Sequence, residues 1–400
     1  MKHYLLNVAV LAIVAVVMLL GGEVLFRSSP SLIGIPVIER MHPELRSRIA
    51  AQLKLPTLND YDVISSVERF DHGPDLYLLK SNQSYFRPVD KVDEAAGAID
   101  TTTTDYRGFC NPLSAATFKS FDIVTVGGSV PNCSMVGGEK VFSNQLGNIL
   151  LMPSYNLTVD AVGPYEYNEI TERYYDELVP RVVVYAISES NDLRDCVRYL
   201  EFVEGKTGDR HSKLGGPFRI SYVLAFLKSS IEVLYKNISA AFGPNFRYTV
   251  KVQGRDVKMN VTNGDLDELK SAERLRDGTI KPDLYAVPLN EFVKFARQRR
   301  FAPLIMYIPA TYTIYQNSIK FEDESIAELM RTYSQAQRDW LEENAKRLGY
   351  EFFDPTEFLR ERALTSPPLY FPSDMHPTSA GHRALAEAIA PTISKIISGQ

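Results

Sequence analysis

Residues 121–129 read FDIVTVGGS, a largely apolar run that ends in two glycines and a serine. Four more short apolar runs follow along the chain: YNLTVDAV (155–162), RVVVYAI (181–187), APLIMYI (302–308) and YEFFDP (350–355). Segments with helical periodicity alternate with them, near residues 139–151, 166–179, 288–299, 323–348 and 378–397. This alternation is typical of a parallel sheet covered by helices. The sequence therefore predicts an α/β fold over residues 121–398, three-layer α/β/α, with a five-stranded parallel sheet.

An insertion over residues 195–287 separates the third run from the fourth. It contains a helix candidate near 218–236 and a possible hairpin, FRYTVKV (246–252) and DVKMNV (256–261), turned by Gly254-Arg255. Residues 28–120 show an irregular pattern that is rich in Pro and Ser. We interpret residues 28–120 as a stalk or wrapping segment.

The N-terminal segment from Tyr4 to Leu20 is apolar except for Asn7. A helix of this length, extended by the apolar residues that follow, could cross the hydrocarbon layer of a bilayer. A cleaved signal peptide is the alternative, but such a peptide has a shorter apolar centre and a small-residue cleavage site. We therefore expect residues 1–27 to be an uncleaved membrane anchor. Lys2 precedes the segment, which favours a single-pass protein whose remaining residues lie outside the cytoplasm.

The composition and the motifs argue against a nucleic-acid-binding protein and against a metalloprotein. The chain has 44 Lys and Arg against 49 Asp and Glu, a net charge of −5, which gives no support for binding to nucleic acid. The three cysteines include no C-x-x-C pair, and the six histidines include no H-E-x-x-H pair. We expect neither a metal site nor a cofactor.

Small and polar residues follow the predicted strands at their carboxyl ends, where open parallel sheets bind ligands. Gly127-Gly128-Ser129 follows the first strand, Gly163 the second, SESND (188–192) the third and SDMHP (373–377) the fifth. Taken singly, these are more often turns, helix caps or surface residues. Together they provide what acyl transfer requires: a hydroxyl nucleophile, a histidine base, an acid that orients it, and donors for an oxyanion.

The four segments resemble, in order, the sequence blocks of the SGNH (GDSL-like) hydrolases and acyltransferases. The matching residues are GGS (127–129), Gly163, Asn191 and DMHPTSAGH (374–382). The resemblance implies a flavodoxin-like sheet with strand order 2-1-3-4-5. It also implies catalytic roles, with Ser129 as the nucleophile, His376 as the base and Asp374 as its orienting acid. The implied oxyanion hole consists of the backbone N–H groups of Ser129 and Gly163 and the side-chain amide of Asn191.

The last block departs from the usual spacing, because Asp374 stands two residues before His376 and Ser373 occupies the third place. This D-x-H spacing, the preceding LYFP (369–372) and the N-terminal anchor look like the alginate-type polysaccharide O-acetyltransferase branch. In the implied strand order the first and third strands are neighbours. Cys133 and Cys196 follow those strands and could form a disulfide, although two separate free thiols are slightly favoured; Cys110 is left open.

We therefore expect a membrane-anchored, extracytoplasmic serine esterase that removes or transfers a short acyl group on a carbohydrate. Its partner would be an acylated small molecule or a glycan. Hydrolysis and transfer use the same residues and stay open. Polar residues around the site favour a shallow pocket sized for acetyl: Asn132, Ser134, Ser188, Glu189 and Ser190. The alternative is a non-catalytic, glycan-binding component of envelope polysaccharide assembly.

Overall fold

The chain forms two compact units, residues 1–63 with 208–244, and residues 64–207 with 245–400. The computed structural model describes residues 2–38, 41, 45, 48–49, 52–53, 64–68, 76–79, 81–82, 84–88, 99–133, 135–206, 220–242, 247–260, 265–372 and 376–399. The insertion predicted at 195–287 contributes to both units, because residues 208–244 group with the N-terminal residues.

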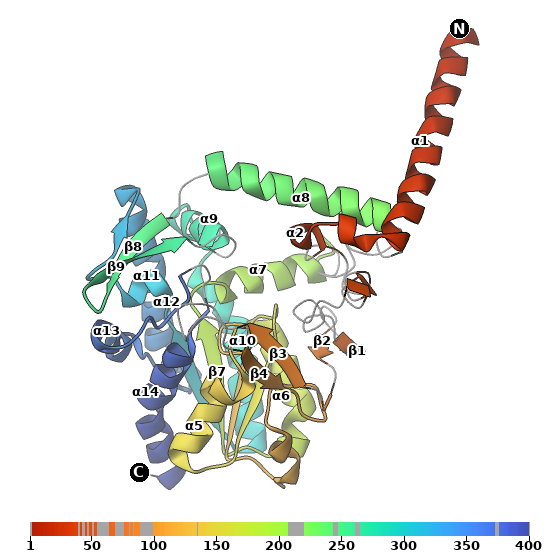
Figure 1. The fold of residues 1–400 in the computed structure, drawn as a ribbon. Coiled ribbons are helices and arrows are strands. Elements are labelled where there is room, and N and C mark those ends of the chain that lie inside the picture. Colours follow the sequence, from red (N-terminus) through yellow and green to blue (C-terminus); the bar gives the residue numbers. More distant parts are fainter. Residues whose placement is uncertain are drawn as a thin grey trace. The chain divides into compact units, whose positions relative to one another are not determined.

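The larger unit is built on a five-stranded parallel sheet, as the sequence predicts (Figure 1). Its strands are β5 (Ile123–Gly127), β6 (Ser154–Thr158), β7 (Val182–Ser188), β10 (Ala302–Ile308) and β12 (Glu351–Phe353). They lie side by side in the order β12-β10-β7-β5-β6. Counted along the chain, this is the order 2-1-3-4-5 that the resemblance implies. Every residue of β5 and β7 is buried, as expected for central strands of a sheet with both faces covered.

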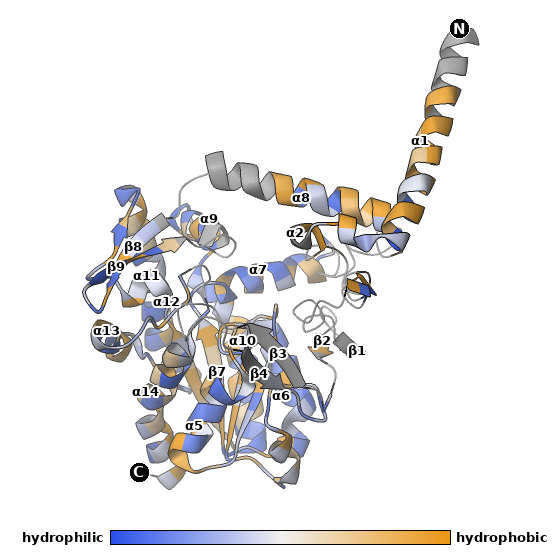
Figure 2. Ribbon diagram, viewed as in Figure 1, coloured by the Kyte–Doolittle hydropathy of each residue, from blue (hydrophilic) through white to orange (hydrophobic). Residues whose placement is uncertain are grey.

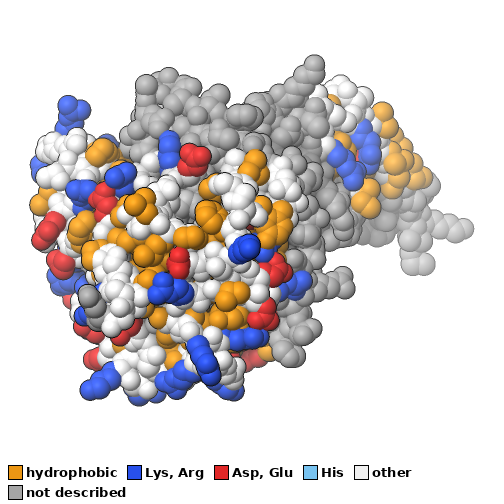
Figure 3. Space-filling model, turned by 90° about the horizontal axis from the view of Figure 1, so that it is seen from below, with side chains coloured by type: hydrophobic (Ala, Val, Ile, Leu, Met, Phe, Trp, Pro, Cys, Tyr) orange, Lys and Arg blue, Asp and Glu red, His pale blue; other side chains and the backbone are white. Residues whose placement is uncertain are grey.

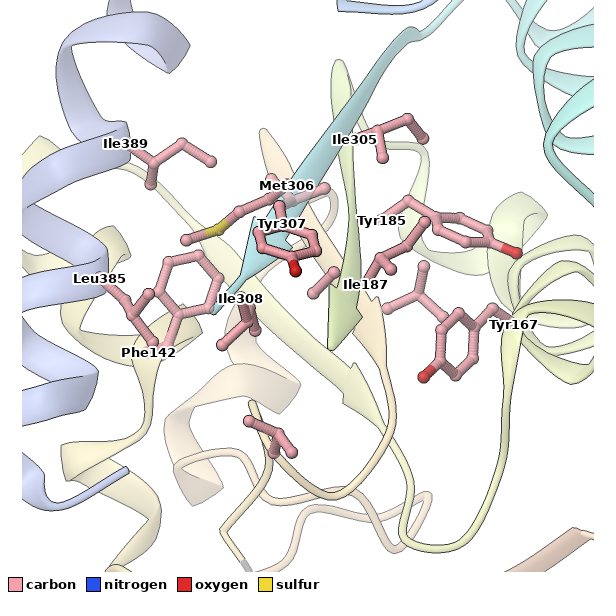
Figure 4. Close-up of a cluster of buried hydrophobic side chains, with 14 of the residues drawn as sticks. Phe142, Tyr167, Tyr185, Ile187, Ile305, Met306, Tyr307, Ile308, Leu385 and Ile389 are labelled. Carbon is pink, nitrogen blue, oxygen red and sulfur yellow. The ribbon is translucent and has the colours of Figure 1, made fainter. Parts of the chain in front are cut away.

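Helices cover both faces of the sheet. The crossovers after β5 and β6 run in opposite directions along the sheet, so right-handed connections place their helices on opposite faces. On one face α5 (Phe142–Leu150) packs with α14 (Ser379–Ser398), and on the other α10 (Ala286–Arg299) packs with α6 (Pro164–Leu178) and α12 (Glu324–Leu348). Figure 4 shows this core, with Phe142, Leu385 and Ile389 on one side of the strands and Tyr167 and Tyr185 on the other.

Several further elements complete the larger unit. The predicted hairpin is present as β8 (Arg247–Val252) and β9 (Arg255–Asn260), and β11 (Lys320–Phe321) pairs with β8. Its turn lies at Gln253-Gly254, one residue earlier than predicted, and both residues have positive φ (49° and 76°), as a tight hairpin requires. Helices that the sequence pattern did not indicate are α7 (Asp192–Val203), α9 (Asp265–Arg276), α11 (Thr311–Ile314) and α13 (Thr356–Thr365), with 3-10 turns η2 (Leu113–Thr117), η3 (Gly138–Lys140) and η6 (Pro282–Tyr285).

The segment preceding the parallel sheet is not wholly irregular. Strands β1 (Ile64–Glu68) and β2 (Leu76–Leu79) pair antiparallel, and so do β3 (Ser84–Pro88) and β4 (Ile99–Thr103). Short polar strands such as IDTTT in β4 carry little apolar periodicity, which explains why the sequence pattern did not reveal them.

The smaller unit is helical, with α1 (Lys2–Ser28), η1 (Pro30–Leu32), α2 (Ile35–Ile38) and α8 (Tyr222–Phe242). Buried apolar side chains join α8 to the N-terminal residues: Ile33, Ile38, Met41, Leu45, Ile49, Tyr222 and Ala225. Across the described helices, none combines the length and the apolar character that crossing a bilayer requires. The structure thus does not support the transmembrane helix predicted over Tyr4–Leu20.

The surface of the larger unit carries mixed charge. In the view of Figure 3, Lys and Arg side chains alternate with Asp and Glu and with small apolar areas over the described part of that face. This agrees with the nearly balanced charge of the sequence.

Candidate active site

Gly128 is the residue at which three of the predicted blocks meet. A Cβ placed on Gly128 would lie 3.2 Å from the carbonyl oxygen of Val162, 2.9 Å from Oη of Tyr167 and 3.9 Å from Oδ1 of Asp192. Val162 shares a peptide bond with Gly163, and Asp192 directly follows Asn191. The segments of Gly163 and Asn191 therefore lie around the residue that precedes Ser129. A side chain at position 128 would push these segments apart.

Ser129 lies two residues beyond the end of β5, in a half-buried turn. The turn is closed by a hydrogen bond from the N–H of Asn132 to the carbonyl oxygen of Ser129 (3.1 Å). The side chain of Asn132 in turn donates to Oδ1 of Asp160, which follows β6 (2.8 Å). A serine on a short, braced turn at the carboxyl edge of a parallel sheet has the placement that a nucleophile needs.

Asn191 is buried, with 6% of its surface exposed, at the N-cap position of α7. Its Oδ1 accepts a hydrogen bond from the hydroxyl of Ser190 (3.4 Å), which leaves the NH2 group on the other side of the amide. The N-terminus of a helix also carries a partial positive charge. Both features suit a donor to an oxyanion.

Gly163 directly precedes α6, and its N–H donates to Oε2 of Glu166 (3.0 Å). This hydrogen bond caps the helix, and the N–H predicted to face an oxyanion is engaged in it. Glu166 is buried, with 1% exposure. For Gly163 to serve a reacting oxygen, its N–H would have to share this bond or leave Glu166.

His376 is half-buried in the loop before α14, whereas Ser373, Met375 and the predicted orienting acid, Asp374, lie outside the described residues. The carbonyl oxygen of His376 accepts the N–H of Phe371 (3.1 Å), and the backbones of Tyr370 and Pro377 form an isolated antiparallel β-bridge. Phe371 is buried in a cluster with four residues of the segments before and after the Ser129 turn: Cys110, Cys133, Val136 and Val141. This cluster joins the loop of His376 to the chain that follows Ser129.

The disulfide joins Cys110 to Cys133, with 6.2 Å between their Cα atoms, so the pairing of Cys133 with Cys196 is wrong and so is the alternative of two free thiols. Cys196 is a free, buried thiol on α7. The pairing of Cys110 with Cys133 follows from hydrogen bonds between Asn111, the residue after Cys110, and the edge strand β6. The side-chain amide of Asn111 accepts the backbone N–H of Asn156 (2.8 Å) and donates to its carbonyl oxygen (3.0 Å), and this places Cys110 beside the Ser129 turn.

His382, in the last block, has a structural role that the sequence analysis did not assign. It is 1% exposed, and its Nδ1 accepts the backbone N–H of Phe142, the first residue of α5 (3.1 Å). Burial, together with the charge of His376, lowers the pKa of His382 to about 3. The neutral ring thus fixes the start of α5 against α14.

The side chain of Asp192, the residue after Asn191, is buried and fixes the start of α7. Asp192 accepts the N–H of Ser188 (3.0 Å) and the hydroxyl of Tyr167, which lies 3.0 Å from each carboxylate oxygen. Burial, with Asp195 nearby, raises the pKa of Asp192 well above its usual range. Tyr167 lies between this carboxylate and Gly128. The Tyr167–Asp192 pair therefore sets the distance between the Ser129 turn and the start of α7.

Four of the five polar residues expected around the pocket are buried, and the fifth is not among the described residues. Asn132, Ser188, Glu189 and Ser190 are buried, and Ser134 lies outside the described residues. Glu189 accepts the N–H of Ala310 (2.9 Å) and the hydroxyl of Thr313 (2.7 Å), so it fixes the loop after β10. Burial raises the pKa of Glu189. These side chains organise the edge of the sheet and give no information about the size of the acyl group.

No family model and no curated protein matches the chain. It is similar to solved structures of GDSL-type lipolytic proteins and carbohydrate esterases. The structure of TesA has 11% identity and a TM-score of 0.38, covering 68% of this chain and 98% of that one. A GDSL-like lipase from Bacteroides thetaiotaomicron has 11% identity and a TM-score of 0.33, covering 71% and 95%. A family 2 carbohydrate esterase with a carbohydrate-binding domain, from Corynascus thermopiles (Myceliophthora fergusii), has 13% identity and a TM-score of 0.36, covering 76% and 72%.

Proposed function

We propose that this chain is an SGNH-type serine enzyme that hydrolyses or transfers an ester-linked acyl group. The observation that carries the proposal is the junction at Gly128, where the segments of Gly163 and Asn191 lie around the residue before Ser129. The resemblance of the four sequence blocks supplies the roles, and the strand order is the one those blocks imply.

In the proposed reaction, Oγ of Ser129 attacks the ester carbonyl carbon while a ring nitrogen of His376 takes the hydroxyl proton. The negative charge that forms on the carbonyl oxygen is stabilised by the N–H of Ser129 and the NH2 of Asn191, with the N–H of Gly163 as third donor when it is released from Glu166. The C–O bond to the alcohol breaks, and His376 returns the proton to the leaving oxygen. Water or a sugar hydroxyl, losing a proton to His376, then attacks the acyl-serine, and His376 returns that proton to Oγ as the acyl–Oγ bond breaks.

For the substrate we propose a short acyl ester on a carbohydrate, with hydrolysis slightly favoured over transfer. The support is the resemblance of the D-x-H block and residues 369–372 to polysaccharide O-acetyltransferases. We also propose an extracytoplasmic location with membrane attachment through α1. The Cys110–Cys133 disulfide favours an oxidising compartment, and apolar side chains of α1 are exposed.

A second candidate is a glycan-binding protein without catalytic activity. The engagement of the Gly163 N–H with Glu166 favours this candidate, because a catalytic oxyanion hole needs free donors. Substituting Glu166→Gln keeps an acceptor for the N–H but removes the charge. If the chain is an enzyme, this variant should retain or increase its turnover.

The test is incubation of the full chain with nitrophenyl esters of increasing acyl length, with and without glycan acceptors. Ser129→Ala and His376→Ala should each abolish turnover, and the double variant should be little worse, because the two groups act as a unit. Ser114→Ala, an exposed serine on η2, is the matched control and should be fully active. Equal activity of Ser129→Ala and Ser114→Ala would refute the proposal. Peak activity on chains of about eight carbons or more would refute the short-acyl substrate alone.

A further inference from the structure

The smaller unit exposes apolar side chains on two of its helices. On α1, exposed apolar residues occur at almost every position from 10 to 25: Val10, Leu11, Ile13, Val14, Val16, Val17, Met18, Leu19, Leu20, Val24 and Leu25. At 100° per residue these positions surround the helix on all sides. A protein partner covers one side of a helix, whereas lipid covers all of them. In Figure 2 most of the described part of this helix is coloured hydrophobic, and a pale to blue stretch interrupts that colour near its C-terminal end.

On α8 the exposed apolar residues form one narrow stripe. Leu227, Ile231 and Leu234 are 46%, 66% and 59% exposed, and Ile220, in the turn before the helix, is 63% exposed. Their spacing of three and four residues places these three helical residues within about 60° of the helix circumference. The opposite side packs into the unit through Tyr222 and Ala225. The three stripe residues carry no charge, and the ion pair of Lys228 with Glu232 lies beside the stripe (3.5 Å).

A polar joint fixes α8 to α1. Glu23 accepts hydrogen bonds from Arg27 (2.7 Å), from the hydroxyl of Ser221 (2.8 Å) and from the N–H of Val223 (3.1 Å). Arg27 also donates to the carbonyl oxygen of Ile220 (3.0 Å). Gly22 permits the close approach, because a Cβ there would lie 2.9 Å from Val223. This charged joint lies within the last two turns of α1, and α8 starts at it and runs crosswise to α1 (Figure 1).

We infer that α8 lies on the surface of the lipid bilayer to which α1 attaches, with the stripe of Leu227, Ile231 and Leu234 inserted among the acyl chains. The inference rests on the proposed membrane attachment. Three features support it: the lipid-like exposure of α1, the uncharged stripe on α8, and a joint of charged and hydroxyl groups suited to the headgroup level. Because α8 belongs to the chain insertion between β7 and β10, the bilayer would hold the chain at a second position as well as at its N-terminus.

The test uses single nitroxide labels on the full chain in vesicles of phosphatidylethanolamine and phosphatidylglycerol. Labels are introduced by Ile231→Cys on the stripe, Val17→Cys on α1 and, as control, Leu364→Cys on α13, which is 65% exposed. Labelling is selective because Cys196 is buried and the other two cysteines are bonded. Oxygen, which partitions into lipid, and a water-soluble nickel chelate report the surroundings of each label.

We expect the label at 231 to lose its relaxation by the nickel chelate and to gain relaxation by oxygen, as the label at 17 does, while the label at 364 shows the reverse. A label at 231 that behaves like the one at 364 would overturn the inference and leave the attachment through α1 intact. Protection of the 231 label from both reagents would also overturn it, since protein would then cover the stripe. If the label at 17 also stays in water, the membrane attachment itself fails.

Discussion

Lowering the pH from 7 to 5 should destabilise the larger unit through His382. The ring is buried, and its Nδ1 accepts the N–H of Phe142, so the folded chain holds it neutral and its pKa is about 3. In the unfolded chain the pKa is about 6.5. Above pH 6.5 both states are neutral at this residue, and below it the unfolded state binds a proton that the folded state excludes. The free energy of unfolding therefore falls between pH 6.5 and about 3, by about 1.4 kcal/mol per pH unit.

At pH 5 the interval of 1.5 pH units corresponds to a loss of about 2 kcal/mol. Urea unfolding at pH 7 and pH 5 measures the loss, and His382→Asn is the matched control, because its side-chain oxygen can accept the N–H of Phe142 but binds no proton. Carboxylates contribute equally to both proteins, so the difference between them isolates His382. We expect the variant to lose about 2 kcal/mol less than the wild type. The same pH dependence in both proteins would refute the assignment of a neutral, buried His382.

Three further predictions concern the site. Gly128→Ala should fold but lose at least about tenfold in kcat/KM, because its Cβ would displace the Val162–Gly163 peptide and Tyr167 by tenths of an ångström. Circular dichroism checks the fold and steady-state kinetics the loss. Full activity of this variant would contradict the convergence of the three segments at Gly128. Asn191→Ala should lower kcat about 10²–10³-fold if its amide is an oxyanion donor, and a loss below tenfold would reassign Asn191 to the structure of the turn before α7. Cys110→Ser should lower the free energy of unfolding by about 3 kcal/mol, because it opens a loop that the disulfide closes across 23 positions. A non-reducing peptide map that shows free Cys110 and Cys133 in the wild type would contradict the pairing.

The parallel sheet was predictable from the sequence because its central strands are buried on both faces. RVVVYAI and APLIMYI are nearly uninterrupted apolar runs, and they became β7 and β10 within one residue of their predicted bounds. The helices α7, α9 and α13 were missed because their sequences are rich in charge; α7, for example, reads DLRDCVRYLEFV. The strands of 64–103 are short and polar, and their pairing depends on contacts that local periodicity does not record.

The candidate site was predictable only as far as chain order allows. The residues that follow β5, β6 and β7 converge because those strands are neighbours, and neighbouring strands end at one edge. Side-chain pairing is different, because it depends on distances between remote segments. The bond of Cys110 to Cys133 follows from Asn111 pairing with the edge of β6, and the bond of the Gly163 N–H to Glu166 follows from the cap of α6. Neither has a signal in the spacing of the motifs.

The central claim, that Ser129 is a nucleophile activated by His376, is tested most directly by a fluorophosphonate reagent. An activated serine hydroxyl displaces fluoride from phosphorus and becomes covalently phosphonylated, with no need to know the natural substrate. Mass spectrometry of the digested full chain should find the adduct on Ser129 in the wild type, no adduct in Ser129→Ala, and labelling slowed by at least about 10²-fold in His376→Ala. Absence of any adduct on Ser129, or labelling at the same rate in His376→Ala, would contradict the account.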